Sequence, residues 1–211
     1  MKKPLLSIGI IFKNEIRCIE RCLKSLQPLR EAIPCELVMA DTGSEDDTIE
    51  IARRHHAQIS EFNWCNDFSA ARNYALEQSD CDWNLILDAD EYLVEGTKKD
   101  LLNFIESGDY AGAIERHDSY KESTGEISQS CVFTTRLVPR GTFYEGKVHE
   151  QIVTKLPIRP LPLIFEHDGY LQEGKGQRNL EILLEELEEK PEDPYTLYQI
   201  ARTLWLMKEY V

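Results

Sequence analysis

The sequence predicts an α/β fold, a doubly wound and mostly parallel sheet with antiparallel additions, followed by C-terminal α-helices. Between residues 5 and 95, short apolar runs alternate with helical patterns, as in parallel sheets. In the second half, strand-like segments follow one another directly, which indicates antiparallel additions. From about Lys175 onward the pattern becomes helical and strongly acidic.

The first half begins with an isoleucine-rich run at 5–12, typical of a strand covered on both faces. Asn14 is expected to cap a helix whose apolar residues recur at helical spacing: Ile16, Ile19, Leu23 and Leu26. A second strand is expected at 36–40, and Ser44 is expected to cap a second helix, with acidic residues in its first turn.

A short third strand is expected at 60–62, a helix at 69–78 and a further strand at 83–87. That last strand runs into the acidic stretch LDADE. Ligands of doubly wound sheets bind beyond the carboxyl ends of the strands. Asn14, Asp41 and the acidic stretch all fall at such ends.

The second half opens with a helix expected from Thr97 through Ile105 and ending at Gly108. Four segments then have strand character: 110–116, 131–138, 143–153 and 161–166. Two helices separated by the sequence PEDP complete the chain.

Composition restricts the class of protein. The 211 residues are 42% hydrophobic and 29% charged, as in soluble globular proteins. The formal net charge of -14 argues against nonspecific binding to nucleic acid or an anionic membrane. No segment is apolar for long enough to form an integral membrane helix, and the apolar N-terminal run is interpreted as a strand rather than a signal peptide. Six scattered cysteines without a C-x-x-C pair favour reduced thiols in a cytoplasmic protein.

Asp88 and Asp90 require a compensating interaction. Two positions apart in an extended chain, they would point the same way and repel by roughly 2–3 kcal/mol at an effective dielectric of about 20. A proton, solvent or a bridging divalent cation could offset this repulsion. Oxygen-only ligands favour Mg²⁺ or Mn²⁺. A D-x-D pattern alone is a weak signal, and a solvated acidic turn after a strand is its default interpretation.

Four ordered motifs carry a family resemblance: SIGIIFKNE, ADTGSEDDT, WCNDFSAARNYAL and DWNLILDADE. In this order they resemble the family 2 glycosyltransferases with a GT-A fold. The resemblance is strong over residues 5–95 and continues less densely through YEGKVHEQI, EHDGY and KGQRNL. The similar subgroup often carries a tetratricopeptide-like extension after the catalytic domain.

The resemblance implies a nucleotide-sugar donor, most often a UDP-sugar, and a divalent metal, Mn²⁺ or Mg²⁺. It assigns Asp41 to the base, Asp88 to the ribose and Asp90 to the metal. It places the remaining nucleotide contacts at Phe12, Asn14, Glu15 and Arg72. Arg72 could instead pair with Asp67 or Glu77 on its own helix, Asp41 could be an ordinary turn residue, and Glu91 is interpreted as a supporting residue.

Inverting transfer needs a base on the face opposite the leaving group. Glu150, with His149 beside it, is the candidate, and the resemblance supports that placement; an outward-facing polar pair is the alternative. His167 could complete the metal shell or be a structural histidine. Lys175 and Arg178 could reach the diphosphate, or merely balance the acidic helix.

The expected domains are a GT-A domain at 1–172, with a nucleotide-binding half at 1–95 and an acceptor half at 96–172, and a tetratricopeptide-like segment at 173–211 that is interpreted as truncated. That segment should dock on the domain, on further repeats or on a protein partner. The expected function is metal-dependent inverting transfer to a glycan, a lipid-linked precursor or a peptide. The alternative is an inactive domain that binds nucleotide sugars or serves as a scaffold. A nucleotidyltransferase is disfavoured, because FKNE stands where its Gly-rich loop would follow the first strand.

Overall fold

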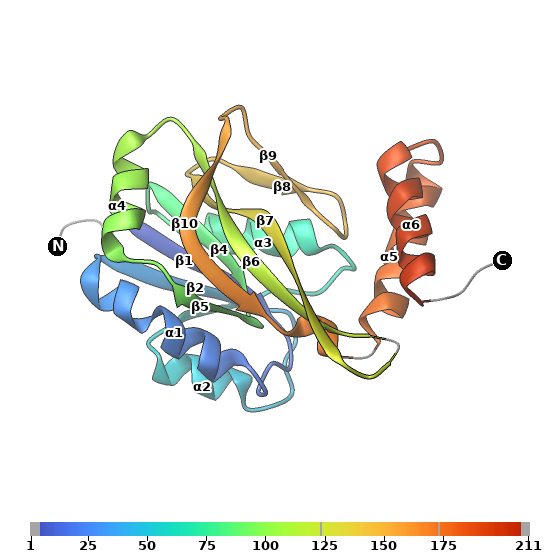
Figure 1. The fold of residues 1–211 in the computed structure, drawn as a ribbon, viewed down its shortest axis with the longest axis horizontal. Coiled ribbons are helices and arrows are strands. Elements are labelled where there is room, and N and C mark those ends of the chain that lie inside the picture. The colour runs from blue at the N-terminus through green and yellow to red at the C-terminus, as the bar shows by residue number, and fades with distance from the viewer. Residues whose placement is uncertain (1–4, 123, 173, 208–211) are drawn as a thin grey trace.

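A computed structural model of the 211-residue chain describes residues 5–122, 124–172 and 174–207 (Figure 1). Within these ranges an eight-stranded mixed sheet has the order β3-β2-β1-β4-β7-β6-β10-β5. The strands are β1 (Leu6–Phe12), β2 (Cys35–Asp41), β3 (Gln58–Glu61), β4 (Trp83–Asp88), β5 (Glu91–Glu95), β6 (Ala111–Lys121), β7 (Ile127–Pro139), β8 (Phe143–Glu145), β9 (Gln151–Val153) and β10 (Ile158–His167). The helices are α1 (Ile19–Ala32), α2 (Thr48–Arg54), α3 (Phe68–Glu77), α4 (Lys98–Ser107), the 3-10 turn η1 (Gly169–Leu171), α5 (Lys175–Glu189) and α6 (Pro194–Met207).

The first four strands in space form the parallel part of the sheet. β1 pairs in parallel with both β2 and β4, and all seven of its residues are buried. Phe12 lies opposite Asp41, and Ile11 lies opposite Asp88. The register therefore brings the carboxyl ends of three strands to one edge, where doubly wound sheets bind ligands.

The remaining strands confirm the expected antiparallel additions. β7 pairs antiparallel with β4 and β6, while β10 pairs parallel with β6 and antiparallel with β5. The segment 143–153 is not one strand; β8 and β9 form a separate small hairpin. Sequence analysis missed β5, whose five residues begin at Glu91, directly after Asp90. β5 pairs with the C-terminal end of β10.

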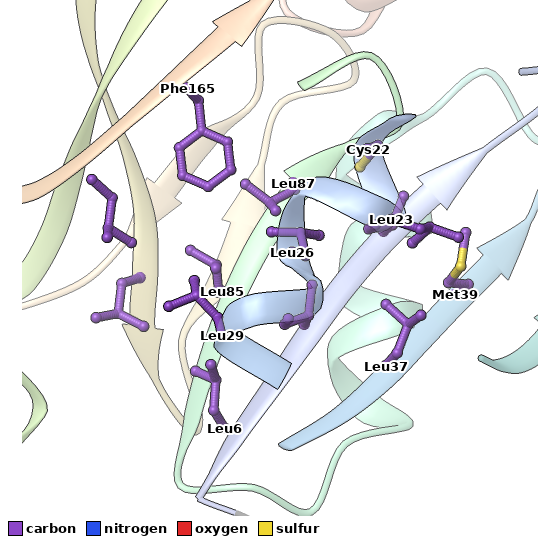
Figure 2. Packing of buried hydrophobic residues seen from close by; sticks show 14 of the residues in the cluster. Leu6, Cys22, Leu23, Leu26, Leu29, Leu37, Met39, Leu85, Leu87 and Phe165 are labelled. Carbon is purple, nitrogen blue, oxygen red and sulfur yellow. The ribbon is translucent and has the colours of Figure 1, made fainter. Parts of the chain in front are cut away.

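Helices cover both faces of the sheet. Core clusters place α1, α2 and α4 against one face, and α3 with the β8–β9 hairpin against the other. Figure 2 shows the largest hydrophobic cluster, in which Leu26 of α1 lies beside Leu85 and Leu87 of β4, with Phe165 of β10 nearby and Leu23 of α1 on the side of Met39. This packing fixes the strand that carries the acidic turn.

Both helix caps expected in the first half are wrong. α1 begins at Ile19, and Asn14 adopts a left-handed φ of 53° outside the helix. Its amide oxygen accepts from the backbone N–H of Glu45 at 2.8 Å, and its own N–H donates to the Ser44 hydroxyl at 3.0 Å. Asn14 and Ser44 thus join the loops after β1 and β2 to each other, so neither caps a helix.

The helix expected after Thr97 is confirmed with both of its ends. Thr97 accepts from the backbone N–H of Asp100, and Asp100 accepts from the N–H of Thr97, which together make a capping box. Gly108 ends α4 with a φ of 70°, in the left-handed region that favours glycine. These local signals suffice to set the bounds of α4.

Replacing Thr97 with alanine should lower the free energy of unfolding by about 1 kcal/mol, because α4 loses a capping acceptor. Urea denaturation monitored by circular dichroism measures the change. Lys99→Ala, an exposed substitution in the same helix, should shift the midpoint much less. Equal shifts for the two variants would contradict the role of the cap.

The two C-terminal helices form a pair beside the β8–β9 hairpin and the β6–β7 ribbon (Figure 1). Ile182 and Leu183 of α5 pack with Val148, and Ile200 of α6 packs against the same cluster. None of the helices in the described ranges is both long and apolar enough to cross a membrane. No disulfide joins the six cysteines, all of which lie in the described part.

Candidate active site

A cleft of about 600 Å³ opens at the carboxyl ends of β1 and β4. Its walls come from α3, the turn after β4, β6, β7, the segment before β9, the end of β10, and helices α5 and α6. Ten of the twelve predicted site residues line it: Phe12, Glu15, Arg72, Asp88, Asp90, His149, Glu150, His167, Lys175 and Arg178. Their convergence from distant parts of the chain defines one site.

The other two predicted residues, Asn14 and Asp41, lie beside the cleft without lining it. The buried carboxylate of Asp41 accepts from the backbone N–H of Ser44 at 3.0 and 3.2 Å. Asp41 therefore braces the loop after β2, and Asn14 joins that loop to the loop after β1. Lys13 and Thr42, which sequence analysis did not single out, line the cleft at this end.

Asp88 lies between two buried arginines. Arg72 of α3 donates to one carboxylate oxygen at 2.5 Å, and Arg136 of β7 donates to the other at 2.6 Å. Burial raises the pKa of Asp88, but the two guanidinium groups outweigh it and hold this pKa well below the usual range. The predicted alternative pairing of Arg72 with Asp67 or Glu77 does not occur, since Asp67 instead caps α3.

Arg136 also pairs with Glu91, whose side chain is completely buried, and Arg116 of β6 donates to the same oxygen of Glu91 at 2.9 Å. Sequence analysis missed both arginines. Their signal was weak: each sits at a position in a strand-like segment where a polar side chain could equally face solvent. Both arginines reach the acidic turn because β7 pairs with β4 and β6 pairs with β7.

The pairing of these arginines adds a compensation for the repulsion between Asp88 and Asp90 that sequence analysis did not predict beside a proton, solvent or a bridging cation. Asp88 has its own arginines, while Asp90 sits in a turn and pairs with Lys175 at 2.8 Å. Because the chain is no longer extended at residues 89–90, the assumption of parallel side chains fails there. Basic side chains of the fold supply the compensation.

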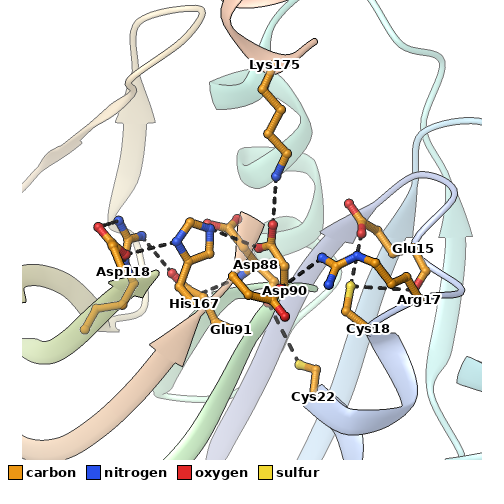
Figure 3. A network of polar contacts seen from close by, with 12 residues as sticks. Glu15, Arg17, Cys18, Cys22, Asp88, Asp90, Glu91, Asp118, His167 and Lys175 are labelled. Atoms are coloured by element: carbon orange, nitrogen blue, oxygen red, sulfur yellow. Dashed lines mark hydrogen bonds and ion pairs between the residues drawn. The ribbon is translucent and has the colours of Figure 1, made fainter. Parts of the chain in front are cut away.

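Asp90, His167 and Asp118 form a chain of contacts across the cleft (Figure 3). The Nε2 atom of His167 lies 3.5 Å from Asp90, and its Nδ1 atom lies 2.9 Å from Asp118. Burial lowers the pKa of His167, but the hydrogen bonds to Asp118 and Asp90 outweigh it and raise the pKa to about 9. A carboxylate behind an imidazole is the arrangement that orients metal-bound histidines.

The space beside this pair suits a cation. A Cβ atom on Gly169 would lie 2.1 Å from Asp90 Oδ2 and 2.5 Å from His167 Nε2, so the glycine keeps that position open. One carboxylate and one imidazole facing this space are donors that Mn²⁺ accepts. The Lys175 ammonium, 2.8 Å from Asp90, supplies the positive charge there now. The site thus offers two protein ligands, with further positions left to water and phosphate.

A second group of side chains able to hold a metal lies outside the cleft. In the described residues, ligand atoms of Glu115, His117 and Cys131 all lie within 4.8 Å of one another on β6 and β7. None of the three lines the cleft. Glu115 and His117 already satisfy each other with a 2.7 Å hydrogen bond.

Glu150, the predicted base, is held by the opposite side of Arg72. The Nε atom of Arg72 donates to Glu150 Oε1, while its Nη2 atom donates to Asp88. Within the described ranges Glu150 Oε2 makes no hydrogen bond, so one oxygen is free to accept a proton. His149 beside it has a left-handed φ of 55°, a strained conformation for a residue other than glycine.

These features together define a GT-A-type site: a mixed α/β sheet with an acidic turn at the carboxyl end of a central strand. The turn faces His167 and the basic residues at the start of α5. The sequence from residue 7 to residue 159 matches the family described as Glycosyl transferase family 2. The chain therefore belongs to glycosyltransferase family 2.

Relatives agree with this assignment. The SPbeta prophage-derived glycosyltransferase SunS of Bacillus subtilis (strain 168) is 28% identical over 216 residues, covering 97% of this chain and 50% of SunS. A TPR repeat-containing protein of Synechococcus elongatus is 30% identical over 215 residues, covering 94% of this chain and 52% of the relative. The chain thus spans about half the length of these curated relatives.

The crystal structure of residues 1–349 of S. aureus TarS in complex with UDP has a TM-score of 0.55 at 16% identity, covering 95% of this chain and 70% of that chain. The complex of the same TarS fragment with UDP-GlcNAc has a TM-score of 0.53, also at 16% identity, covering 95% and 71% of the two chains. These structures confirm the predicted GT-A fold and the presence of C-terminal helices. The tetratricopeptide-like character of those helices stays a prediction.

Proposed function

We propose that this domain, residues 1–172, is a metal-dependent inverting glycosyltransferase that uses a UDP-sugar. The observation that carries the proposal is the double pairing of Arg72, which ties Asp88 at the strand end to Glu150 across the cleft. The binding of UDP and UDP-GlcNAc by the structurally similar TarS supports this choice of donor. The acceptor would be a hydroxyl or thiol on a glycan, a lipid-linked precursor or a peptide, in the cytoplasm.

In the proposed reaction, the acceptor hydroxyl attacks the anomeric carbon from the face opposite the diphosphate. The bond from that carbon to the β-phosphate oxygen breaks, and the electron pair leaves with UDP. Glu150 Oε2 takes the acceptor proton, while Arg72 holds the carboxylate in place through Oε1. Arg72 Nη1 and Arg136 Nε are buried without a hydrogen-bond partner, and both side chains line the cleft. Their N–H groups can therefore donate hydrogen bonds to oxygen atoms of the nucleotide sugar.

Asp90 and His167 would hold the cation, with Asp118 orienting the imidazole. When bound, a divalent cation supplies positive charge that stabilises the leaving diphosphate. Lys175, displaced from Asp90, would turn to the same phosphates. The basic side chains of Lys175 and Arg178, from the start of α5, then neutralise the rest of the leaving group.

Calorimetric titration of UDP, with and without Mn²⁺, tests the donor and the metal. UDP should bind more tightly with Mn²⁺, and Asp118→Asn should weaken the Mn²⁺-dependent part by about 10–100-fold, as substitutions behind a metal-bound histidine do. Asp90→Asn should weaken it at least as much. Gly169→Ala, which leaves every ligand in place but fills the open position, should do the same.

Asp109→Asn, at an exposed aspartate outside the cleft, is the matched control and should bind as the unchanged protein does. A gain in UDP affinity on adding Mn²⁺ that Asp90→Asn leaves intact would overturn the metal role. A protein that binds no UDP under either condition would overturn the donor assignment itself.

A further inference from the structure

We propose that helix α6 forms a wall of the acceptor site and selects an acceptor that carries a hydroxyl group close to a negative charge. The proposal rests on the function proposed above. It concerns three side chains of α6 that line the cleft next to Glu150: Tyr195, Gln199 and Arg202. All three lie beyond residue 159, where the match to the family ends.

Sequence spacing places the three residues on one side of the helix. Positions 195, 199 and 202 are separated by four and three residues, which puts their side chains one above another on a single helical face. Tyr198 and Trp205 point elsewhere and are 62% and 63% exposed. The face of α6 that meets the cleft is therefore polar, while its exposed side is aromatic.

Direct hydrogen bonds hold this face against the segment that carries the base. The Tyr195 hydroxyl donates to the carbonyl oxygen of His149 at 2.9 Å, and Gln151 Nε2 donates to the Tyr195 hydroxyl at 2.8 Å. His149, in its left-handed conformation, and Gln151 flank Glu150 on either side. Tyr195 thus fixes the backbone around the proposed base.

Apolar packing keeps the helix pair in this position. Ile182, Leu183 and Ile200 enclose Val148, in a cluster that also includes Trp64 and Phe68. At the edge of this cluster Lys147 pairs with Glu189 at 2.7 Å. Helices α5 and α6 are consequently packed against the segment 147–151 that carries Glu150.

Gln199 supplies an unsatisfied polar atom. Its side chain lines the cleft although the residue is only 6% exposed, and its Oε1 atom has no hydrogen-bond partner. A buried carbonyl oxygen without a donor is unfavourable for stability. A hydroxyl hydrogen from a bound acceptor would satisfy it.

Arg202 supplies the charge. The residue is exposed, lines the same cleft, and forms no ion pair within the described part of the chain. Most other basic groups of the cleft have carboxylate partners, as Arg72, Arg116, Arg136 and Lys175 do. An uncommitted guanidinium one helical turn from Gln199 suits an acceptor whose hydroxyl lies near a phosphate or carboxylate.

Glycerol 3-phosphate, which joins hydroxyl groups to a phosphate, is the probe. Saturable chemical-shift changes should appear when it is titrated into the intact protein holding UDP and Mn²⁺. Gln199→Met and Arg202→Gln should each weaken the probe by about tenfold, as loss of a hydrogen bond to a bound group predicts. UDP affinity should stay within about twofold, because these side chains face the acceptor.

Three controls make the result decisive. Lys190→Gln removes a charge at the end of α5, outside the cleft, and should leave probe binding unchanged. Glycerol should bind more weakly than glycerol 3-phosphate. Gln199→Met should lower the melting temperature only slightly, because Oε1 makes no hydrogen bond and only the amide contact with Tyr195 is lost, whereas a glutamine with a mainly structural role would lower it more.

Probe binding that both variants retain, or a probe that never saturates, would overturn the acceptor wall while leaving the donor site intact. Equal affinities for glycerol and glycerol 3-phosphate would remove the role of Arg202. Failure of the unchanged protein to bind UDP at all would instead overturn the proposed function, and this inference with it.

Discussion

Replacing Arg136 with methionine is expected to lower the free energy of unfolding by about 3–5 kcal/mol, because the substitution removes one of the two arginine partners of both Asp88 and the fully buried Glu91. Arg136 is 5% exposed in its side chain and pairs with both Asp88 and the fully buried Glu91. Burial opposes the charged guanidinium, yet Glu91 and Asp88 raise its pKa well above the usual value. Urea denaturation at neutral pH measures the loss.

Arg140→Met is the matched control, four residues further along the chain and directly after the same strand. Its pair with Asp80 is largely solvated, with side-chain exposures of 54% and 86%, so its loss should cost between about 0 and 1 kcal/mol. Similar costs for the two arginines would contradict the view that buried compensation holds the acidic turn. A change in the denaturant slope would instead indicate an altered denatured state.

A double substitution separates charge compensation from packing. Adding Glu91→Gln to Arg136→Met removes the buried negative charge that the first change leaves with Arg116 as its partner, and should restore roughly 1–3 kcal/mol of the loss. Arg116 keeps its contact with residue 91, so recovery should be incomplete. No recovery would indicate that the arginine acts through packing alone.

Local patterns predicted several elements of the fold well. The apolar run of β1, the capping box of Thr97 and the acidic end of β4 are each encoded in neighbouring residues, and each was predicted close to its observed position. Asn14 and Ser44 show where such reasoning fails. Both have the composition of a helix cap, but contacts between two loops thirty positions apart use their polar atoms instead.

The partners of the acidic turn required the second half of the chain. Arg116, Asp118 and Arg136 sit in strand segments whose order in the sheet, β4-β7-β6-β10, does not follow their order in sequence. A one-residue change of register would turn each of them to the other face. Sequence patterns therefore identified the carboxylates at strand ends but assigned their compensation to a cation rather than to arginines.

His167 and Glu150 were placed from motifs, and the structure brings both to the cleft with the others. What motifs could not provide was the support behind them. Asp118 lies behind His167, and Tyr195 fixes the carbonyl next to Glu150, through contacts that span forty-six or more residues. Such contacts have no local signature, because they arise only when β10 and α6 pack beside the sheet.

Replacing Glu150 with glutamine should reduce turnover of a UDP-sugar by about 10²–10⁴-fold, the usual contribution of a positioned base. Glutamine keeps the shape of the side chain, and its amide oxygen can still accept from Arg72 Nε, so the arginine stays in place. What disappears is a carboxylate oxygen able to take the acceptor proton. Release of UDP, measured with a donor that the unchanged protein turns over, gives the comparison.

UDP affinity in Glu150→Gln should remain close to that of the unchanged protein, because Asp88, Asp90 and both arginines are untouched. Glu145→Gln, on the exposed surface of β8, should retain full turnover and controls for the loss of one negative charge. If Glu150→Gln kept more than about a tenth of the activity, the proton would have to leave by another group. A lost UDP affinity would instead assign Glu150 to holding Arg72 for the donor, since one arginine serves both carboxylates.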